Sequence, residues 1–548
     1  MIFRKKHIKN ENQKGKWPLN DARDSLNNKK LMKGINDNVA DVKNIFQNDS
    51  DFISRKFQLC GTITAEALFI STIVDTDKIN RDIIRPLQEK RQDPITDFTP
   101  LTLDKKQERR KKDFLQWLLD DVLYHCAGET AEEMQSVINA LLRGKTVIFI
   151  DGAEEALLLD TYKPEKRGIE QPETERVVRG PREGFIEQIQ TNIYLLRYRL
   201  PVPEFRVEPM VAGNATKTKI SVCYLDNLAS KELVNEVKRR VNDICIDRIL
   251  DAGYIEQLIQ DNPRSPFPQI QNTERPDKAV GNLLEGRVVI LVDGSPFALI
   301  VPAIFNQFYH TSEDYNDRWL VASLVRIIRF VALIFALTFS SFYITILSFH
   351  PELIPAKFVV AASSGRAGVP FPVVVEVLVM EVSMEILREA TVRMPQQVGG
   401  ALSIVGVLVI GQAAVMAGFV SPITVVIIAM STIGSFATPS YNAATAFRML
   451  RFPLIILSGM FGLLGLSVGL MFIINHMLSL RSFGIPYLAP VSPGNLQGFK
   501  DSVIRAPLRW LKERPAQLHP QDVTRVASGV KKGSANTLQD NEGGKSDA

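Results

Sequence analysis

Charged residues are unevenly distributed along this chain, and their distribution limits the possible folds more than any other feature. No Asp, Glu, Lys or Arg occurs in residues 330–351, 394–447 or 452–480, whereas the chain before Arg329 is strongly charged. A membrane-spanning helix needs about 20 apolar residues, so these stretches are long enough for about one, two and one spans. A buried core helix would explain any one stretch, but three of them favour a polytopic membrane domain.

The fold class predicted from this pattern is an α/β N-terminal soluble region of two similar subdomains, followed by an α-helical polytopic membrane domain. The N-terminus lacks the apolar segment of a cleaved signal peptide, and its first residues are rich in Lys, Asn and Asp, which is typical of disorder. The predicted domains, in chain order, are a disordered basic arm (1–55), a first subdomain (56–162), a linker (163–184), a second subdomain (185–305), a juxtamembrane connector (306–329), a membrane domain of four to five spans (330–480) and a polar tail (481–548).

A weak repeat supports the two subdomains. Residues 143–162 read RGKTVIFIDGAEEALLLDTY and residues 285–305 read EGRVVILVDGSPFALIVPAIF, each with Asp-Gly between two apolar runs. Asp-Gly at this position favours a hairpin with a type I′ turn, so the turns are Asp151-Gly152 and Asp293-Gly294. Two unrelated hairpins that share a common turn are the alternative to a duplication.

The elements expected before each hairpin follow the same order. The first subdomain has a strand at 68–74, a helix at 77–90 and a helix at 129–142. The second has a strand at 220–225, a helix at 230–250 and a helix near 277–284. In the helix at 230–250 the apolar face consists of Leu233, Val237, Val241 and Ile244.

The linker contains RGPREGF at residues 179–185 and leads into an amphipathic helix with Phe185, Ile189, Ile193, Leu196 and Leu200 on one face. Its residues Arg179, Gly180, Pro181 and Arg182 belong either to a solvated connector or to an ordered loop that faces a partner. The sequence alone favours the connector.

Several classes of function are disfavoured. A net charge of +5 from 65 basic and 60 acidic residues is too small to indicate nucleic-acid binding, and the four cysteines show no CxxC or zinc spacing. Gly144-Lys145-Thr146 is not a phosphate-binding loop, because Asn139 occupies the position of the first glycine and the segment precedes a strand. We therefore predict no catalytic, cofactor or metal site, and no enzyme activity.

The segment 370–393 looks like a helix but carries Glu376, Glu381, Glu385 and Glu389. The last three are spaced i, i+4, i+8 and form one stripe, while Glu376 lies about 140° away from Glu381. Carboxylates at membrane depth are costly and usually face water or a partner, so the functional interpretation is a cation pathway. In the structural alternative Glu389 pairs with Arg393, and Glu385 with Arg388. Glu376 has no basic residue within one helical turn, which favours the functional interpretation for this carboxylate.

The apolar stretches also bear on packing and topology. Gly465-xxx-Gly469 permits close helix contacts, within one bundle or between copies. Arg326, Arg329 and the basic tail place both chain ends in the cytosol, with four or five crossings. Four full spans satisfy both chain ends but place the pair Arg448 and Arg451 outside. A fifth span at the carboxylate helix satisfies the pair but exports the tail, unless residues 453–480 are re-entrant.

Several long segments together resemble the GerA family of bacterial spore germination proteins. They are TERPDKAVGNLLEGRVVILVDGSPFALIVPAIFNQFYHTSEDYNDRW (273–319), RGPREGF (179–185), PFPVVVEVLVMEVSMEILREATVRMP (370–395), GALSIVGVLVIGQAAVMAGFVSPITVV (400–426) and SFGIPYLAP (482–490). The resemblance implies the A subunit of a nutrient germinant receptor in the spore inner membrane. It also implies a transporter-like B subunit and a lipoprotein C subunit as partners, and homo-oligomers that form a nutrient-gated cation channel. A non-conducting scaffold that links a nutrient sensor to a separate channel is the alternative. A secondary transporter is disfavoured because no inverted repeat is evident.

Overall fold

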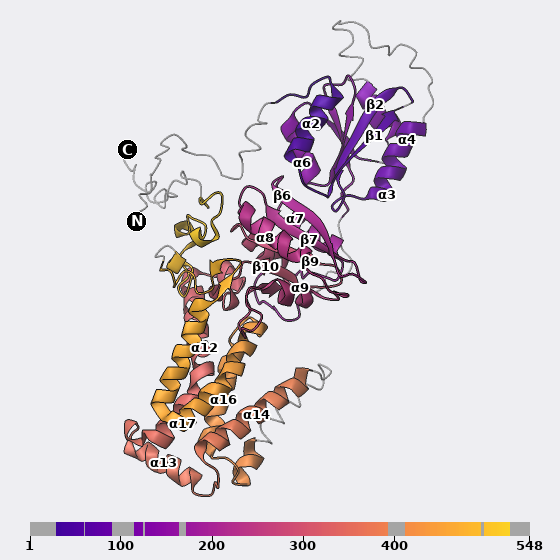
Figure 1. The fold of residues 1–548 in the computed structure, drawn as a ribbon. Helices are drawn as coiled ribbons and strands as arrows, with labels where there is room; N and C mark the ends of the chain where they lie inside the picture. The colour runs from indigo at the N-terminus through magenta and orange to yellow at the C-terminus, as the bar shows by residue number, and fades with distance from the viewer. Residues whose placement is uncertain are drawn as a thin grey trace, which may run out of the picture.

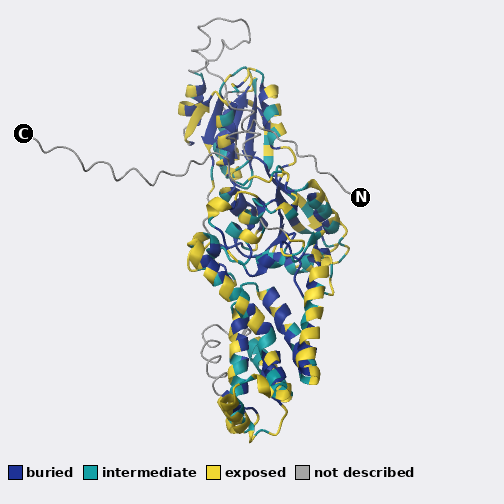
Figure 2. Ribbon diagram, turned by 90° about the vertical axis from the view of Figure 1, so that its left-hand side faces the viewer, coloured by how far each residue is buried: buried dark blue, intermediate teal, exposed yellow. Residues whose placement is uncertain are grey.

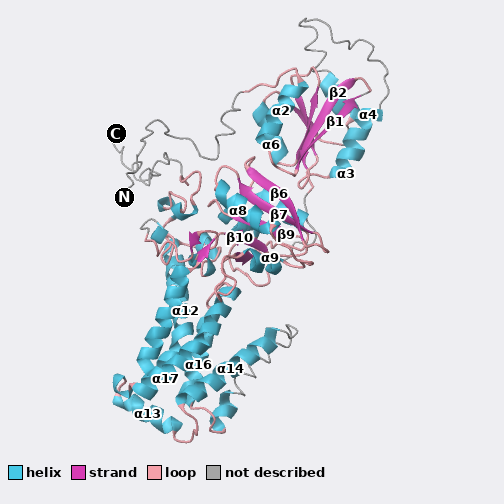
Figure 3. Cartoon of the chain, in the orientation of Figure 1, coloured by secondary structure: helices cyan, strands magenta, loops and turns pink. Residues whose placement is uncertain are grey.

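The computed structural model describes residues 29–59, 61–89, 114–123, 126–163, 171–392, 411–494 and 498–525. Figure 1 shows an elongated arrangement, with a first α/β unit at one end, a second in the middle and a bundle of helices at the other end. Figure 3 shows that strands are concentrated in the two α/β units, whereas the bundle is helical.

The first unit is a five-stranded antiparallel sheet in the order β1-β2-β4-β5-β3. Helices α2 and α6 lie on one side of it, and the helical segment from α3 to α4 lies on the other (Figure 1). Its elements are α2 (Ile35–Ile45), β1 (Phe52–Leu59), β2 (Ile63–Ile70), α3 (Thr76–Lys78), η2 (Ile79–Ile84), α4 (Arg85–Glu89), η3 (Leu118–Val122), β3 (Gly128–Ala131), α6 (Met134–Leu142), β4 (Lys145–Ile150) and β5 (Ala156–Asp160).

The second unit repeats this plan, with a five-stranded antiparallel sheet in the order β6-β7-β9-β10-β8. In both units a short strand precedes a helix and a hairpin, so the prediction of two similar α/β subdomains is confirmed. Its elements are α7 (Ile189–Arg199), β6 (Phe205–Ala212), β7 (Thr218–Leu225), α8 (Lys231–Asn242), α9 (Ala252–Ile259), β8 (Gln271–Thr273), α10 (Pro276–Leu283), β9 (Val288–Val292) and β10 (Ala298–Val301).

Two predicted helices have different bounds. The helix expected at 129–142 begins at Met134, because residues 128–131 form β3 and pair with β5. The helix expected at 230–250 ends at Asn242. Its buried face consists of Val234, Val237 and Val241, while Leu233 is only partly buried.

The prediction of a disordered arm as far as residue 55 is wrong for residues 35–55. Ile35, Val39 and Val42 recur at helical spacing and are buried in the core of the first unit, so α2 forms there. β1 begins at Phe52. Residues 1–28 lie outside the described residues.

The linker is not a solvated connector where the structure describes it. Thr174 donates from its backbone N–H and its hydroxyl to the carboxylate of Glu274. Glu175 accepts from Thr273 and forms an ion pair with Lys278 at 2.6 Å. These contacts hold the linker against the second unit.

The helical half contains α12 (Trp319–Phe349), α13 (Ala356–Arg366), α14 (Val373–Val392), α16 (Pro422–Phe436) and α17 (Tyr441–Ser479). By length and composition, α12 and α17 are able to cross a membrane, and α16 is a shorter apolar helix. α12 begins at Trp319, before the span expected from residue 330. Figure 2 shows exposed residues along the outside of these helices, and they include large apolar side chains such as Leu324, Ile334 and Phe335.

α17 is a hairpin of two helices and not one straight rod. The backbone is non-helical at Gly462, whose φ of 57° is accessible to glycine without strain. Beyond the turn, a Cβ at Gly465 would overlap the carbonyl oxygen of Leu457, and one at Gly469 would lie 2.5 Å from the Leu454 side chain. The two glycines therefore allow the antiparallel halves to pack closely within this chain.

Both ends of α17 lie beside the connector, which contains η4 (Phe305–Phe308) and α11 (Glu313–Asn316). The backbone N–H of Ser440 donates to the carbonyl of Phe308 at 3.3 Å, and that of Phe305 donates to the carbonyl of Tyr487 at 2.8 Å. The chain thus returns after α17 to the side on which the two sheets lie.

The C-terminal segment predicted as a polar tail is folded onto the second unit. Asn306 donates to the hydroxyl of Ser502 at 2.7 Å, and Arg514 donates to the carbonyl of Leu284 at 2.8 Å. Residues 498–525 therefore form part of the junction between the second unit and the helical half, while residues 526–548 lie outside the described residues.

Candidate functional site

The four predicted carboxylates of α14 do not share one environment. Glu376 and Glu381 are buried, whereas Glu385 is 43% exposed at its side chain and Glu389 is exposed. α14 packs against α12, α16 and α17, so residues on its inner face meet side chains from far along the sequence.

Glu376 is neutralised by Arg366 of the preceding helix, α13. The Nε of Arg366 lies 3.0 Å from one carboxylate oxygen, and the other oxygen accepts from the backbone of Ser421 and the hydroxyl of Thr424, both at 3.0 Å. The sequence prediction that Glu376 has no basic partner nearby fails because Arg366 lies ten residues earlier, across the turn between α13 and α14. The geometry gives Glu376 a structural role inside one chain.

Glu381 is paired with Arg451 of α17, at 2.7 Å between Oε2 and Nη1, and accepts from the hydroxyl of Ser340 at 2.8 Å. Both charged side chains are nearly fully buried. Within the described residues, the Nε and Nη2 atoms of Arg451 have no hydrogen-bond partner, so Glu381 supplies the one partner this guanidinium has there. The pair Arg448 and Arg451 between two apolar stretches was the sequence signal for such a buried partner.

Glu385 and Glu389 lie together on the open face. Glu385 is 2.8 Å from Arg388, the pairing that the structural alternative proposed, and 3.4 Å from Arg448. With Val382, Ile386, Ala390 and Phe452, the two carboxylates line an open hollow of about 650 Å³ between α14 and α17. The proposed pairing of Glu389 with Arg393 lies outside the described residues.

The predicted hairpin turns anchor the chain segment that enters each unit. Asp293 accepts at 3.3 Å from the backbone of Ile189 at the start of α7, and Gly294 donates to Glu187 at 2.8 Å. In the first unit Asp151 donates from its backbone to Thr64, and Gly152 donates to Lys33. The residues of both turns therefore hydrogen-bond to other segments of the same chain, which is a structural role.

The predicted partner-facing residues lie beside the connector. Arg179 is 3.6 Å from Asp317, and the carbonyl of Pro181 accepts from Arg275 at 3.0 Å. Gly180 has φ 143°, and a Cβ there would lie 3.0 Å from the side chain of Asn316. Arg182 is exposed.

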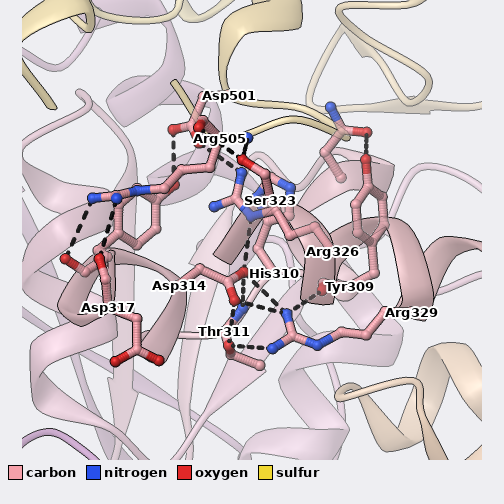
Figure 4. Close-up of polar contacts among 12 residues, drawn as sticks. Tyr309, His310, Thr311, Asp314, Asp317, Ser323, Arg326, Arg329, Asp501 and Arg505 are labelled. Atoms are coloured by element: carbon pink, nitrogen blue, oxygen red, sulfur yellow. Dashed lines mark hydrogen bonds and ion pairs between the residues drawn. The ribbon is translucent and has the colours of Figure 1, made fainter. Parts of the chain in front are cut away.

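A second cluster, which the sequence analysis did not predict, lies at the start of α12; we call Asp314, Arg326, Arg329 and Asp501 the junction network (Figure 4). The fully buried guanidinium of Arg326 is 2.9 Å from Asp314 and 2.7 Å from Asp501. Arg329 is 2.9 Å from Asp314. The network joins the connector, α12 and the C-terminal segment. At its centre are Arg326 and Arg329, which the sequence analysis interpreted only as markers of membrane topology.

The network changes the protonation of its neighbours. Burial and the charge of Arg326 lower the pKa of His310 to about 4, and this ring is held 2.8 Å from the carbonyl of Ser502. Burial would raise the pKa of Asp314, but Arg326 and Arg329 together hold it below its ordinary value. The junction therefore contains a neutral histidine next to a charged pair at neutral pH.

Within the described residues no group of three or more His, Cys, Asp or Glu side chains is placed to hold a metal ion. The chemistry at both clusters is that of paired charges. Such clusters can position helices, transmit movement or attract ions.

The family model of the Bacillus/Clostridium GerA spore germination protein matches residues 40–517. Spore germination protein KA of Bacillus subtilis is 40% identical over 89% of this chain and 87% of its own length. The uncharacterized membrane protein YfkQ of Bacillus subtilis is 36% identical over 88% and 91%. The N-terminal domain of the A subunit of the Bacillus megaterium spore germinant receptor GerK3, a crystal structure, is 30% identical, with a TM-score of 0.38, over 50% of this chain and 98% of that chain. The chain belongs to the GerA family of spore germination proteins.

Proposed function

We propose that this protein is the A subunit of a nutrient germinant receptor in the spore inner membrane, and that several copies together form a cation channel. The family match, the relative named a membrane protein and the apolar helices α12 and α17 support the membrane setting. A transporter-like B subunit and a lipoprotein C subunit are the partners that the family resemblance implies.

The topology that fits this proposal keeps both chain ends on the cytosolic side. The connector, α12 and the C-terminal segment meet at the junction network, and α17 turns back at Gly462 to end beside the connector. A re-entrant or doubly crossing α17 places Arg448 and Arg451 in the half of the hairpin nearer to the cytosol, as the positive-inside rule favours.

The open position of Glu385 and Glu389 is the observation that carries the channel proposal. Glu376 and Glu381 are buried in ion pairs with Arg366 and Arg451, whereas Glu385 and Glu389 line a hollow on the outside of the chain. Glu385 also pairs with Arg388 there and lies 3.4 Å from Arg448, but its side chain remains 43% exposed. Carboxylates at membrane depth are retained where they face water or a partner. In an oligomer, rings of such carboxylates attract cations.

The junction network gives this channel a physical link to its soluble half. Arg326 lies on α12, while its partners Asp314 and Asp501 lie on the connector and the C-terminal segment. A shift of the second unit would have to move α12 or break a buried ion pair, which is costly. Nutrient binding elsewhere in the receptor would reach the helices by this route.

The channel proposal is tested by cation flux from liposomes that contain the assembled receptor. Replacing both carboxylates, Glu385→Gln with Glu389→Gln, should lower nutrient-triggered K⁺ flux about tenfold or more. The control is Glu352→Gln, which removes a carboxylate that is 65% exposed and outside α14. Wild-type flux in the double variant would contradict the proposal.

The alternative is a non-conducting scaffold that links a nutrient sensor to a separate channel. The burial of Glu376 and Glu381 in pairs within one chain favours it, since those two carboxylates are not available to ions. Under this alternative, liposomes with the assembled receptor show no flux, although variants of the junction network still abolish germination.

A further inference from the structure

A cavity of about 550 Å³ lies on the soluble side of the junction, away from α14. Its wall combines α10, the connector and the C-terminal segment, which are distant in sequence but adjacent in the fold. The volume is within the range of pockets that bind small organic molecules. Nothing in the proposed ion pathway uses this cavity.

The ionisable side chains of the wall leave an excess of positive charge. Six of them are held in five ion pairs: Asp277 with Arg275, Lys278 with Glu175, Glu285 with Arg287, Asp501 with Arg326, and Arg514 with Asp522. Lys500, Lys512 and Arg525 have no ion-pair partner among the described residues, against the single carboxylate of Glu513. The cavity therefore favours an anion.

The rest of the wall favours a flat apolar body. Leu508, Trp510 and Leu511 line the cavity, and Trp510 is 65% exposed. An indole with a free face stacks readily on another planar group. The cavity therefore favours an organic anion that carries a flat apolar group over an inorganic anion.

One deeply buried polar atom also lacks a partner. The side-chain amide of Gln271 donates to the carbonyl of Gln307 at 3.1 Å, but its Oε1 accepts from no donor in the described residues. Gln271 is 2% exposed and lines the cavity. Buried acceptors are nearly always satisfied, so a ligand N–H at this position would complete its hydrogen bonding.

We propose that this cavity is a binding site for a small organic anion with a flat apolar body and an amine or amide N–H. The anionic group contacts Lys500 and Lys512, the flat body packs against Trp510, and the N–H donates to Gln271. Tyr315, also in the wall, donates to Asp501 at 2.8 Å. The bound anion therefore lies next to the junction network and stabilises it.

Equilibrium dialysis of the detergent-purified full chain tests the site, with the same detergent on both sides. The probe is 5-aminonaphthalene-1-sulfonate, which combines a sulfonate, a flat apolar body and an amine N–H. The matched comparison is 1-naphthylmethylammonium, which has a similar body and the opposite charge. The sulfonate should bind and the cation should bind at least about tenfold more weakly.

Charge reversal at the exposed lysines locates the binding. The double variant Lys500→Glu with Lys512→Glu should raise the dissociation constant of the sulfonate at least about tenfold, or 1.4 kcal/mol, and Trp510→Ala should raise it several-fold. The control with equal charge change is Lys217→Glu with Lys231→Glu, at exposed positions of the second unit. Absence of sulfonate binding, equal binding of the cation, or equal affinity in the two double variants would overturn the proposal.

Discussion

Removing the negative charge of Glu381 should destabilise the helical half by about 3–5 kcal/mol. The Glu381 side chain is 5% exposed and that of Arg451 is 3% exposed, with 2.7 Å between their charged atoms. In Glu381→Gln the guanidinium stays charged and buried, and two of its nitrogens already lack partners in the described residues. The cost is therefore that of an unpaired buried charge and not of one lost contact.

Removing both charges should restore most of the lost stability. In Glu381→Gln with Arg451→Met, no buried charge remains and the methionine fills part of the arginine volume, so the double variant should lie within about 2 kcal/mol of the wild type. The matched single variant is Glu385→Gln, which removes a carboxylate 43% exposed at its side chain. Its expected cost is about 0–1 kcal/mol.

Pulse proteolysis in detergent across a denaturant series measures these free energies of unfolding. The reasoning would be refuted if Glu381→Gln cost no more than Glu385→Gln and also lowered cation flux. Glu381 would then face the ion pathway, and its pairing with Arg451 would not be its main role.

Three further predictions concern the junction and the hairpin. The pKa of His310 is about 4 in the folded chain and about 6.5 in the unfolded chain, so the unfolded chain binds more protons between these pH values. The free energy of unfolding should therefore fall by up to about 3 kcal/mol as the pH drops from 6.5 to 4. His310→Gln should remove this part of the pH dependence of the thermal midpoint. Asp501→Asn leaves Arg326 with Asp314 alone as its carboxylate partner, so limited proteolysis should cut residues 498–525 faster than in wild type, while unchanged cleavage would contradict the network. Gly465→Ala meets the backbone of α17 and should cost about 1–3 kcal/mol, whereas Gly281→Ala, with open space around it, should be neutral or slightly stabilising in the same unfolding assay.

The features that the sequence predicted well are local ones. Asp-Gly between apolar runs indicated the place of both hairpins, but not their turn type. The loops run over residues 151–155 and 293–297 with positive φ at Gly152 and Gly294 and not at the aspartates, so the predicted type I′ turns do not form. Gly465-xxx-Gly469 indicated a close helix contact, and the structure places it inside α17. The arm was mispredicted because the short apolar face of α2 is surrounded by polar residues and is buried only by contact with the first sheet.

The charge pairs could not be predicted, since their members are distant in sequence. Glu381 and Arg451 are 70 residues apart, and Arg326 and Asp501 are 175 residues apart. Each arginine alone is equally consistent with a topology signal and with a buried partner. Only the three-dimensional packing of α12, α14 and α17 decides between them, and it divides the predicted stripe into a buried Glu381 and an open Glu385 with Glu389.

The central claim is that Glu385 and Glu389, rather than Glu376 and Glu381, lie along a cation pathway. The most direct test is the reversal potential across a planar bilayer that contains the assembled receptor in a KCl gradient. With Glu385→Lys and Glu389→Lys together, the potential should shift from the K⁺ equilibrium value toward the Cl⁻ value, while Glu352→Lys should leave it unchanged. A reversal potential in the double variant identical to that of the wild type would contradict the account.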